Sequence, residues 1–254
     1  MIEARAVSFA YADAEAVREC SVQLRKGLLY AIIGPNGSGK STLLRLLSNL
    51  ALPKSGRLLL KGREYASYER REFARSVALM PQTRSVPEMT VREYVEHGRY
   101  PFLPFSQRFS AADRAAVEKA LIETEMSGFA ERFLRELSGG ERQRAYLALL
   151  LAQDPKFALL DEPTTFLDIS AQFQVMEILR RMRDEGRCVV AVLHDLSMAM
   201  QFCDRIIVMS EGKIIANEAP DDLAASHVWE EVFGIRCMQI CMGNDKKYLF
   251  EPKK

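Results

Sequence analysis

The sequence has no long hydrophobic run and almost no excess of charge of either sign. Its longest apolar run, residues 145–152, is far shorter than the ~20 apolar residues that cross a bilayer. The N-terminus also lacks the basic and then apolar pattern of a secretory signal peptide. We therefore expect a cytosolic protein rather than a secreted or membrane-spanning one.

The near balance of charges argues against nucleic acid as a partner. The formal net charge is +1, from 35 Lys and Arg against 34 Asp and Glu. Such a chain has no strong positive field for a phosphate backbone. Lysines recur near the C-terminus, at positions 246, 247, 253 and 254, where they predict a solvated tail.

Cysteine is sparse, and its spacing does not indicate disulfides. The five cysteines, at 20, 188, 203, 237 and 241, contain no Cys-x-x-Cys pair, so we expect reduced and mostly structural thiols. Cys237 and Cys241 have a spacing that also fits half of a metal site, but His227 is the nearest histidine. With 48% hydrophobic residues, 254 residues can bury a core without cross-links, as one large domain or two closely joined lobes.

Residues 34–42 read Gly-Pro-Asn-Gly-Ser-Gly-Lys-Ser-Thr, which matches the phosphate-binding pattern G-x-x-x-x-G-K-[ST]. The apolar run 28–33 before it has the length of a buried strand, and leucines at 43, 44, 46, 47 and 50 recur at helical spacing after it. This strand–loop–helix context separates the pattern from a glycine-rich turn that binds nothing. Its backbone amides would hold phosphates, Lys40 would reach the β- and γ-phosphates, and Ser41 would bind Mg²⁺. The predicted nucleotide-binding residues are Gly34, Pro35, Asn36, Gly37, Ser38, Gly39, Lys40, Ser41 and Thr42.

Three further apolar runs of strand length, 77–80, 157–160 and 189–193, show no polar alternation, as expected of parallel strands covered on both faces. A polar residue follows each run: Gln82 the first, Asp161 and Glu162 the second, and His194 the third. Ligands of open α/β sheets bind at the carboxyl ends of the strands. We therefore expect these side chains to converge on the phosphates.

The chemistry of these residue types predicts ATP hydrolysis. Asp161 and Ser41 would hold Mg²⁺, with Gln82 on the water shell of the metal, while Glu162 would orient or deprotonate the attacking water. His194 would donate to the γ-phosphate oxygens. An Asp-Glu pair is otherwise a solvated strand end, and a lone histidine is otherwise a satisfied surface or core residue.

A second candidate anion site lies at residues 137–141, Leu-Ser-Gly-Gly-Glu. Ser138 and Glu141 have the spacing of a capping box, and the helix that they open is expected to end at Asp154 and Pro155. A well-capped helix is a sufficient explanation by itself. The two glycines nevertheless leave the amides of this helix start open to an anion.

In this order, four motifs spread over nearly the whole chain resemble those of the ATP-binding subunit of an ABC transporter. They are the loop at 34–42, Leu-Ser-Gly-Gly-Glu-Arg-Gln-Arg at 137–144, Leu-Leu-Asp-Glu-Pro-Thr-Thr-Phe-Leu-Asp at 159–168 and Leu-His-Asp at 193–195. The resemblance implies a P-loop α/β fold with a mostly parallel sheet, N-terminal antiparallel strands and a helical subdomain. It also implies one ABC ATPase domain over 1–254, with a RecA-like core at about 1–85 and 156–254 and the helical subdomain at about 86–155.

The resemblance also assigns residues and partners. It implies that Ser138, Gly139, Gly140 and Glu141 are the signature, Gln82 the Q-loop residue, Asp168 the D-loop aspartate, His194 the switch histidine and Tyr11 the aromatic that stacks on adenine. Two copies would pair head to tail, each ATP lying between the Lys40 loop of one and the Ser138 loop of the other. Tyr11 could instead be a strand-edge residue. The family usually has Gln where this chain has Glu141, and the added negative charge could slow closure of the dimer.

The stretch between Gln82 and the signature has helical patterning: residues 90–93 form a capping box, and residues 110–113 open a second helix that runs through Ile122. Between them, residues 98–105 form a proline-broken aromatic segment that cannot be a regular helix or a central strand. This segment either packs onto the core of its own chain or, with Gln82, contacts a membrane permease. Later residues predict a helix capped by Asp195 and a hairpin of 206–209 with 214–216.

Two less specific motifs, at 90–102 and 163–169, are similar to those of importer ATPases for iron–siderophore complexes, haem and cobalamin. That resemblance implies a subunit peripheral to the inner face of the membrane, with a permease and an extracytoplasmic solute-binding protein. Alternatives are a non-transport ABC ATPase, such as that of iron–sulphur cluster assembly, an export subunit, and a nucleotide-binding module without catalysis. The presence of Glu162 and His194 argues against the last.

Overall fold

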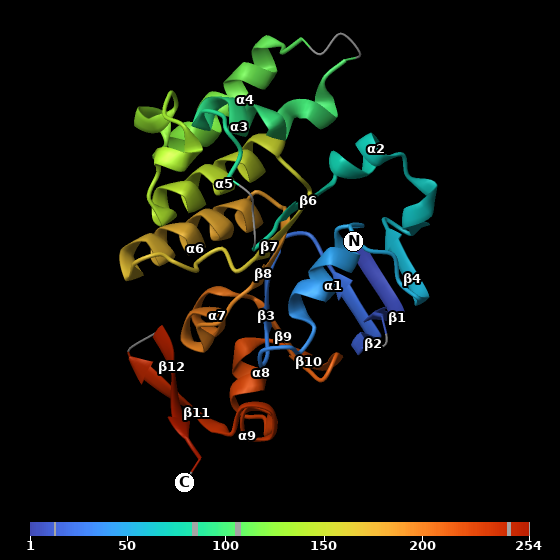
Figure 1. The fold of residues 1–254 in the computed structure, drawn as a ribbon. Coiled ribbons are helices and arrows are strands. Elements are labelled where there is room, and N and C mark those ends of the chain that lie inside the picture. The colour runs from blue at the N-terminus through green and yellow to red at the C-terminus, as the bar shows by residue number, and fades with distance from the viewer. Residues whose placement is uncertain (13, 83–85, 105–107, 243–244, 254) are drawn as a thin grey trace.

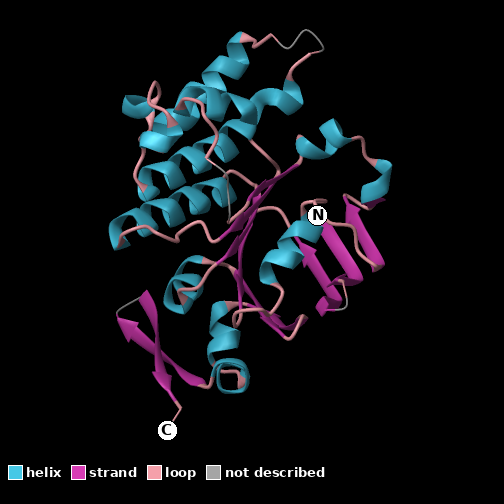
Figure 2. Ribbon diagram, in the orientation of Figure 1, coloured by secondary structure: helices cyan, strands magenta, loops and turns pink. Residues whose placement is uncertain are grey.

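A six-stranded, mostly parallel sheet forms the centre of the molecule (Figures 1 and 2). The computed structural model describes residues 1–12, 14–82, 86–104, 108–242 and 245–253. The strand order is β10-β9-β3-β8-β7-β6, and every pair is parallel except β9 with β10. The strands are β3 (Leu28–Ile33), β6 (Val77–Met80), β7 (Phe157–Asp161), β8 (Cys188–Val192), β9 (Arg205–Ser210) and β10 (Lys213–Glu218).

The predicted α/β fold class is confirmed, and its physical basis is the burial of these strands. Every residue of β7 and β8 is buried, which explains their continuous apolar sequence. Both strands agree with the predicted runs to within one residue. The predicted hairpin is also present, as β9 and β10.

An antiparallel sheet of order β2-β1-β4-β5 lies beside the central sheet (Figure 1). Its strands are β1 (Ile2–Tyr11), β2 (Ala14–Leu24), β4 (Ser55–Leu60) and β5 (Arg63–Glu64), followed by the 3₁₀ turn η1 (Tyr65–Ser67) and α2 (Arg70–Ala74). The helix α1 (Lys40–Leu47) packs its leucines between the two sheets. Contrary to the leucine spacing, Leu50 is not part of that helix, because Asn49 takes a left-handed conformation (φ 61°). The Leu50 side chain is 63% exposed.

A group of helices, here called the helical lobe, lies at one end of the central sheet (Figure 2). It consists of α3 (Val91–Glu96), η2 (His97–Phe102), α4 (Ala111–Glu123), η3 (Ser127–Phe129), η4 (Leu134–Glu136) and α5 (Gly139–Gln153). The predicted capping box at Thr90 is formed, and the helix expected to open at Ser110 is present as α4, which the structure shows to begin with a capping box as well. The lobe has a hydrophobic cluster of its own, which includes Val91, Leu121 and Leu134. The predicted division into a RecA-like core and a helical subdomain stays a prediction.

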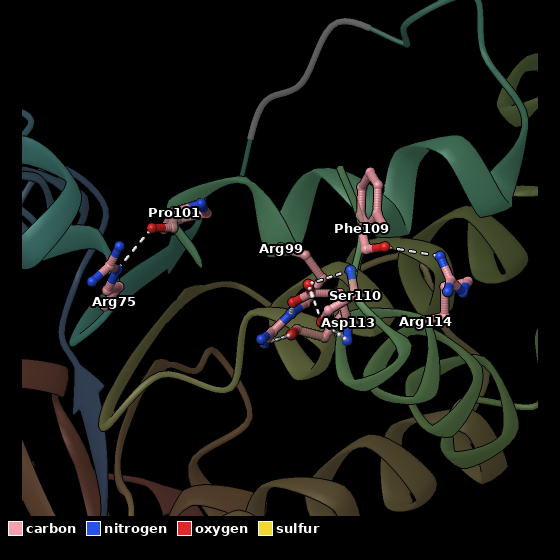
Figure 3. A network of polar contacts seen from close by, with 8 residues as sticks. Arg75, Arg99, Pro101, Phe109, Ser110, Asp113 and Arg114 are labelled. Atoms are coloured by element: carbon pink, nitrogen blue, oxygen red, sulfur yellow. Dashed lines mark hydrogen bonds and ion pairs between the residues drawn. The ribbon is translucent and has the colours of Figure 1, made fainter. Parts of the chain in front are cut away.

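Much of the aromatic segment after α3 packs onto its own chain. Residues 97–102 form a 3₁₀ helix that contains Pro101, so the main chain is helical although not α-helical. The guanidinium of Arg75 donates to the Pro101 carbonyl at 2.8 Å, and that of Arg99 binds Asp113 at 3.0 Å (Figure 3). Leu103 is buried, whereas Tyr100 is 48% exposed. Phe105, the last residue of the predicted segment, lies outside the described residues.

The C-terminal residues form a small folded unit rather than a tail. After α6 (Ile169–Asp184) and α7 (Leu196–Phe202), the latter capped by Asp195 as predicted, come α8 (Pro220–Ala224), α9 (Val228–Phe233) and the hairpin β11 (Ile235–Met242) with β12 (Asp245–Pro252). Trp229 is buried against Phe250 of that hairpin, with ring centroids 4.9 Å apart. Lys246 and Lys253 form ion pairs with Asp221 and Glu230. Lys246 and Lys247 therefore lie in a strand rather than in a tail, although Lys246 and Lys253 are exposed as predicted, and Lys254 lies outside the described residues.

The described residues also bear on membranes and metals. No helix within them combines the length and apolar character needed to cross a membrane. The same ranges contain no group of three or more His, Cys, Asp or Glu side chains arranged to hold a metal ion. The free thiols of Cys20, Cys188 and Cys203 are buried in the core.

Candidate active site

The glycine-rich loop joins β3 to α1 and is fixed by close contacts with neighbouring strands. At Gly34 (φ 153°) a Cβ atom would lie 2.1 Å from the carbonyl oxygen of Met209, and at Gly39 (φ 96°) 2.2 Å from that of Ala16. Any side chain at these two positions would displace main chain. The loop therefore requires glycine for packing as well as for access to a ligand.

Lys40 lies across the loop that precedes it. Its Nζ donates to the carbonyl oxygens of Gly34 and Pro35, at 2.8 and 2.9 Å. Burial lowers the pKa of Lys40, and the carboxylates of Glu162 and Asp161 oppose that change. A buried ammonium held by two carbonyl oxygens is well placed to receive an anionic phosphate.

A cleft of about 440 Å³ brings together most of the predicted catalytic residues. It is lined by the loop around Lys40 together with Gln82, Glu162 and His194, from the ends of three parallel strands. Ala16 on β2 closes one side. The convergence expected from the strand ends is present in the structure, whereas the individual roles of these residues stay predictions.

Asp161 forms an oxygen pair with Ser41, which lines this cleft. The Ser41 hydroxyl donates to Oδ1 of Asp161 at 3.0 Å. Burial raises the pKa of Asp161, and the hydrogen bond from Ser41 partly offsets this change. A hydroxyl beside a buried carboxylate is a donor set that suits Mg²⁺ and that a cation would stabilise. The residues present therefore fit the metal expected from the sequence.

Glu162 and His194 are in direct contact. Oε1 of Glu162 lies 2.6 Å from Nε2 of His194, and Oε2 accepts a hydrogen bond from the Thr165 hydroxyl at 3.1 Å. The Glu162 side chain is 11% exposed. Its backbone is left-handed, with φ 54°, a conformation that costs a non-glycine residue about 1–2 kcal/mol. Such strain is typical of functional positions, where the surrounding structure holds it in place.

The predicted signature residues begin α5, away from the cleft around Lys40. Ser138 is the N-cap, and its capping box with Glu141 is formed, because Ser138 N donates to Oε2 of Glu141 at 2.8 Å. This bond lowers the pKa of Glu141. Ser138, Gly139, Gly140 and Glu141 are absent from the lining of that cleft as far as the described chain shows. One protomer therefore keeps its two candidate phosphate sites apart.

Tyr11 and Asp168 do not line the cleft around Lys40 in the described part of the chain. Tyr11 ends β1, is 46% exposed and packs edge-to-face on Phe9 with centroids 4.9 Å apart. Its predicted stacking on adenine stays a prediction. Asp168 caps α6, accepting from Ala171 N at 2.8 Å, so its side chain has a structural role within the chain itself.

Two residues at the site were not anticipated. Thr165 binds the Glu162 carboxylate, and Gln143 on α5 donates to the carbonyl oxygens of Glu162 and Pro163. Thr165 lies three residues after Glu162, a spacing that could have suggested the contact. No local signal links Gln143 to Glu162, because the contact depends on how α5 packs beside the end of β7.

Comparison with known families decides the class of the protein, since the profile described as ABC transporter matches residues 17–165. The chain belongs to this family. As an ABC ATPase, the chain binds nucleotide; that the cleft around Lys40 holds it stays a prediction.

Two curated relatives match this ABC ATPase over nearly its whole length. The ferric enterobactin transport ATP-binding protein FepC of Escherichia coli is 41% identical over 92% of this chain and 87% of its own length. The petrobactin import ATP-binding protein FpuC of Bacillus anthracis is 38% identical over 100% of this chain and 93% of its own. The similarity therefore includes the C-terminal unit and is not confined to the motifs.

Solved structures show the same fold. A bacterial ABC transporter cassette crystallised as a dimer is 27% identical, with a TM-score of 0.77, covering 87% of this chain and 99% of its own. A transporter assigned to the metal-chelate type, in an inward-facing conformation, is 24% identical, with a TM-score of 0.84, covering 99% and 96%. The latter likeness concerns the fold alone.

Proposed function

We propose that this ABC ATPase energises the uptake of an iron–siderophore complex through a separate membrane permease. The observation that carries the proposal is the near full-length similarity to FepC and FpuC, which are named for ferric enterobactin transport and petrobactin import. The related solutes haem and cobalamin remain alternative cargoes. The names of these relatives favour a siderophore.

In the proposed reaction Glu162 orients or deprotonates the water that attacks the γ-phosphate of ATP. Its contact with His194 at 2.6 Å supports a shared task, in which His194 donates to the γ-phosphate oxygens. Lys40 binds the β- and γ-phosphates, and the backbone amides of the loop at 34–42 hold the other phosphate oxygens. Ser41 and Asp161, with Gln82 on the water shell, would hold Mg²⁺, which would supply positive charge to neutralise the phosphates.

Two copies act together in this proposal, paired head to tail. The distance of the Ser138 loop from its own Lys40 cleft supports such pairing, as does the dimeric cassette of the same fold. Ser138, Gly139 and Gly140 of one copy would then hold the phosphates bound by the partner, Asp168 would lie at the interface, and Tyr11 would stack on adenine.

The membrane partner is proposed to contact Gln82 and residues 98–105 from the cytoplasmic side. The exposure of Tyr100 supports this contact. Leu103 is buried, so its side chain is not part of the proposed contact surface. The ATPase would thus be peripheral to the inner face of the membrane. A solute-binding protein would deliver the complex from the other side.

Growth of a strain that lacks the gene, supplied with one iron source at a time, tests which solute is transported. We expect growth to fail on one class of ferric siderophore and to recover with the wild-type gene, but not with Glu162→Gln. The chain should also co-purify from membranes with a polytopic permease. Co-purification with a soluble iron–sulphur scaffold alone, or accumulation of solute inside the deletion strain, would instead support the assembly ATPase or the exporter.

A further inference from the structure

Two glutamine side chains from different helices hold the loop that follows β7. Nε2 of Gln143, on α5, donates to the carbonyl oxygens of Glu162 at 3.3 Å and Pro163 at 2.8 Å. Nε2 of Gln172, on α6, donates to those of Thr164 at 3.5 Å and Leu167 at 3.1 Å. The main chain from Glu162 to Leu167 is thus held at its start by one helix and farther along by the other.

These bonds matter because the loop has an unfavourable backbone conformation. Glu162 and Phe166 are left-handed, with φ of 54° and 66°. Non-glycine residues keep such angles only where surrounding contacts impose them. The bonds of Gln143 fall on the carbonyl of Glu162 itself and on the next one. Gln143 therefore helps to fix the direction in which the Glu162 side chain leaves the backbone, toward His194.

Gln143 also belongs to the helix that the signature residues open. It lies about one turn into α5, which runs from Gly139 to Gln153 without interruption. A displacement of the Ser138 end of this helix therefore moves Gln143 with it. Through the two hydrogen bonds, that displacement reaches the peptide that joins Glu162 to Pro163.

In the head-to-tail dimer proposed above, these two ends of the connection serve different ATP molecules. Ser138 of one protomer contacts the ATP held by its partner, whereas Glu162 of the same protomer acts on the ATP held by its own Lys40 loop. A rigid helix and one side chain thus connect the two sites within one chain, which is the kind of physical link that coupling between sites requires.

We propose that Gln143 is a positioning residue that couples the two ATP sites of the dimer. When the Ser138 loop closes on the partner's ATP, α5 moves, and Gln143 passes the movement to the backbone of the catalytic carboxylate. Hydrolysis at one site then depends on occupancy of the other. This inference rests on the proposed head-to-tail dimer and on the proposed role of Glu162.

The test is the ATP dependence of phosphate release by the full-length chain. Wild type should show a Hill coefficient above 1, with a limit of about 2 for two sites. Gln143→Met keeps the length of the side chain but removes its donor. We expect the Hill coefficient to fall to about 1 and kcat to fall about tenfold, with less than about a twofold change in the ATP concentration at half-maximal rate.

Two glutamines provide matched controls. Nε2 of Gln172 binds the same loop from α6, outside the signature helix, so Gln172→Met should lower kcat and leave the Hill coefficient at its wild-type value. Nε2 of Gln153, at the other end of α5, donates to the carbonyl of Ala74 at 2.8 Å, away from the loop. Gln153→Met should leave both quantities unchanged. A general loss of packing in α5 would affect Gln153→Met as well.

A second substitution guards against a folding defect. Gln143→Leu likewise lacks the donor and adds no charge beside the two carbonyl oxygens, so it should reproduce the lost cooperativity while retaining a near wild-type melting temperature and bound nucleotide. A wild-type Hill coefficient of about 1, or an unchanged coefficient in folded Gln143→Met, would overturn the coupling. Glu162→Gln, measured in parallel, separates the proposals: normal turnover in that variant would overturn the role of Glu162 instead.

Discussion

Replacement of Glu162 by Gln removes the proposed proton acceptor with little change in shape. The wild-type carboxylate contacts His194 through Oε1 and the Thr165 hydroxyl through Oε2. A glutamine can keep both contacts: its oxygen accepts from Thr165, and its amide donates to Nε2 of a neutral His194 protonated on Nδ1. We therefore expect a change in stability below about 1 kcal/mol.

The loss should instead appear in the chemical step. General acid–base catalysis typically contributes about 10²- to 10⁴-fold, so kcat should fall by that factor, or by about 2.7–5.5 kcal/mol of transition-state stabilisation. Phosphate release at saturating ATP measures this loss, and equilibrium binding should show near-normal affinity for ATP. The same reasoning predicts that ATP-bound dimers of the variant persist.

Glu125 offers a matched control, because it is an exposed glutamate that is also left-handed, with φ 58°, and is absent from the lining of the cleft within the described residues. Glu125→Gln should leave kcat unchanged. The assignment of Glu162 would be refuted by turnover of Glu162→Gln within a few-fold of wild type. Loss of ATP binding in that variant would also refute the reasoning, because the effect would then precede the chemistry.

The remaining predictions concern four other positions. Gly34→Ala should destabilise the fold by more than about 2 kcal/mol in denaturant titration, because its Cβ would lie 2.1 Å from the Met209 carbonyl oxygen; an unchanged midpoint would contradict this packing. Asp161→Asn should raise the melting temperature at pH 7 without nucleotide or metal, since burial raises the pKa of Asp161 by penalising its ionised form. That gain should shrink as pH falls through the raised pKa, where the wild-type carboxyl becomes neutral, and a gain that grows in acid would be inconsistent with it. Glu141→Gln keeps an acceptor for Ser138 N and removes a charge, so the ATP concentration at half-maximal rate should fall about two- to fivefold rather than rise. Tyr11→Ala should weaken equilibrium nucleotide binding by about 1–3 kcal/mol, and an unchanged affinity would exclude stacking.

Local patterns predicted the regular elements well where a few neighbouring residues determine the conformation. The predicted capping boxes at Thr90 and Ser138 formed because each needs only a hydroxyl and a carboxylate three residues apart. Periodicity was misleading at Leu50, because the leucine spacing continues past the point where the left-handed Asn49 ends the helix.

The C-terminal hairpin was missed for the opposite reason. Its lysines suggest solvent, and nothing nearby in sequence reveals that Trp229 packs against Phe250 or that Lys246 pairs with Asp221. Strand pairing of β11 with β12 depends on these distant partners. A hairpin of two strands is marginal alone, so packing on the rest of the chain stabilises it.

The sequence by itself determined the chemistry, since the phosphate loop, the carboxylates after β7 and the capped signature helix are each encoded within a few consecutive residues. Tertiary packing alone decided how these groups face one another. It places Glu162 2.6 Å from His194, separates Ser138 from the Lys40 cleft and brings Gln143 to the Glu162 main chain. Such contacts join separate elements, and their geometry follows from how strands and helices pack rather than from any local preference of the residues.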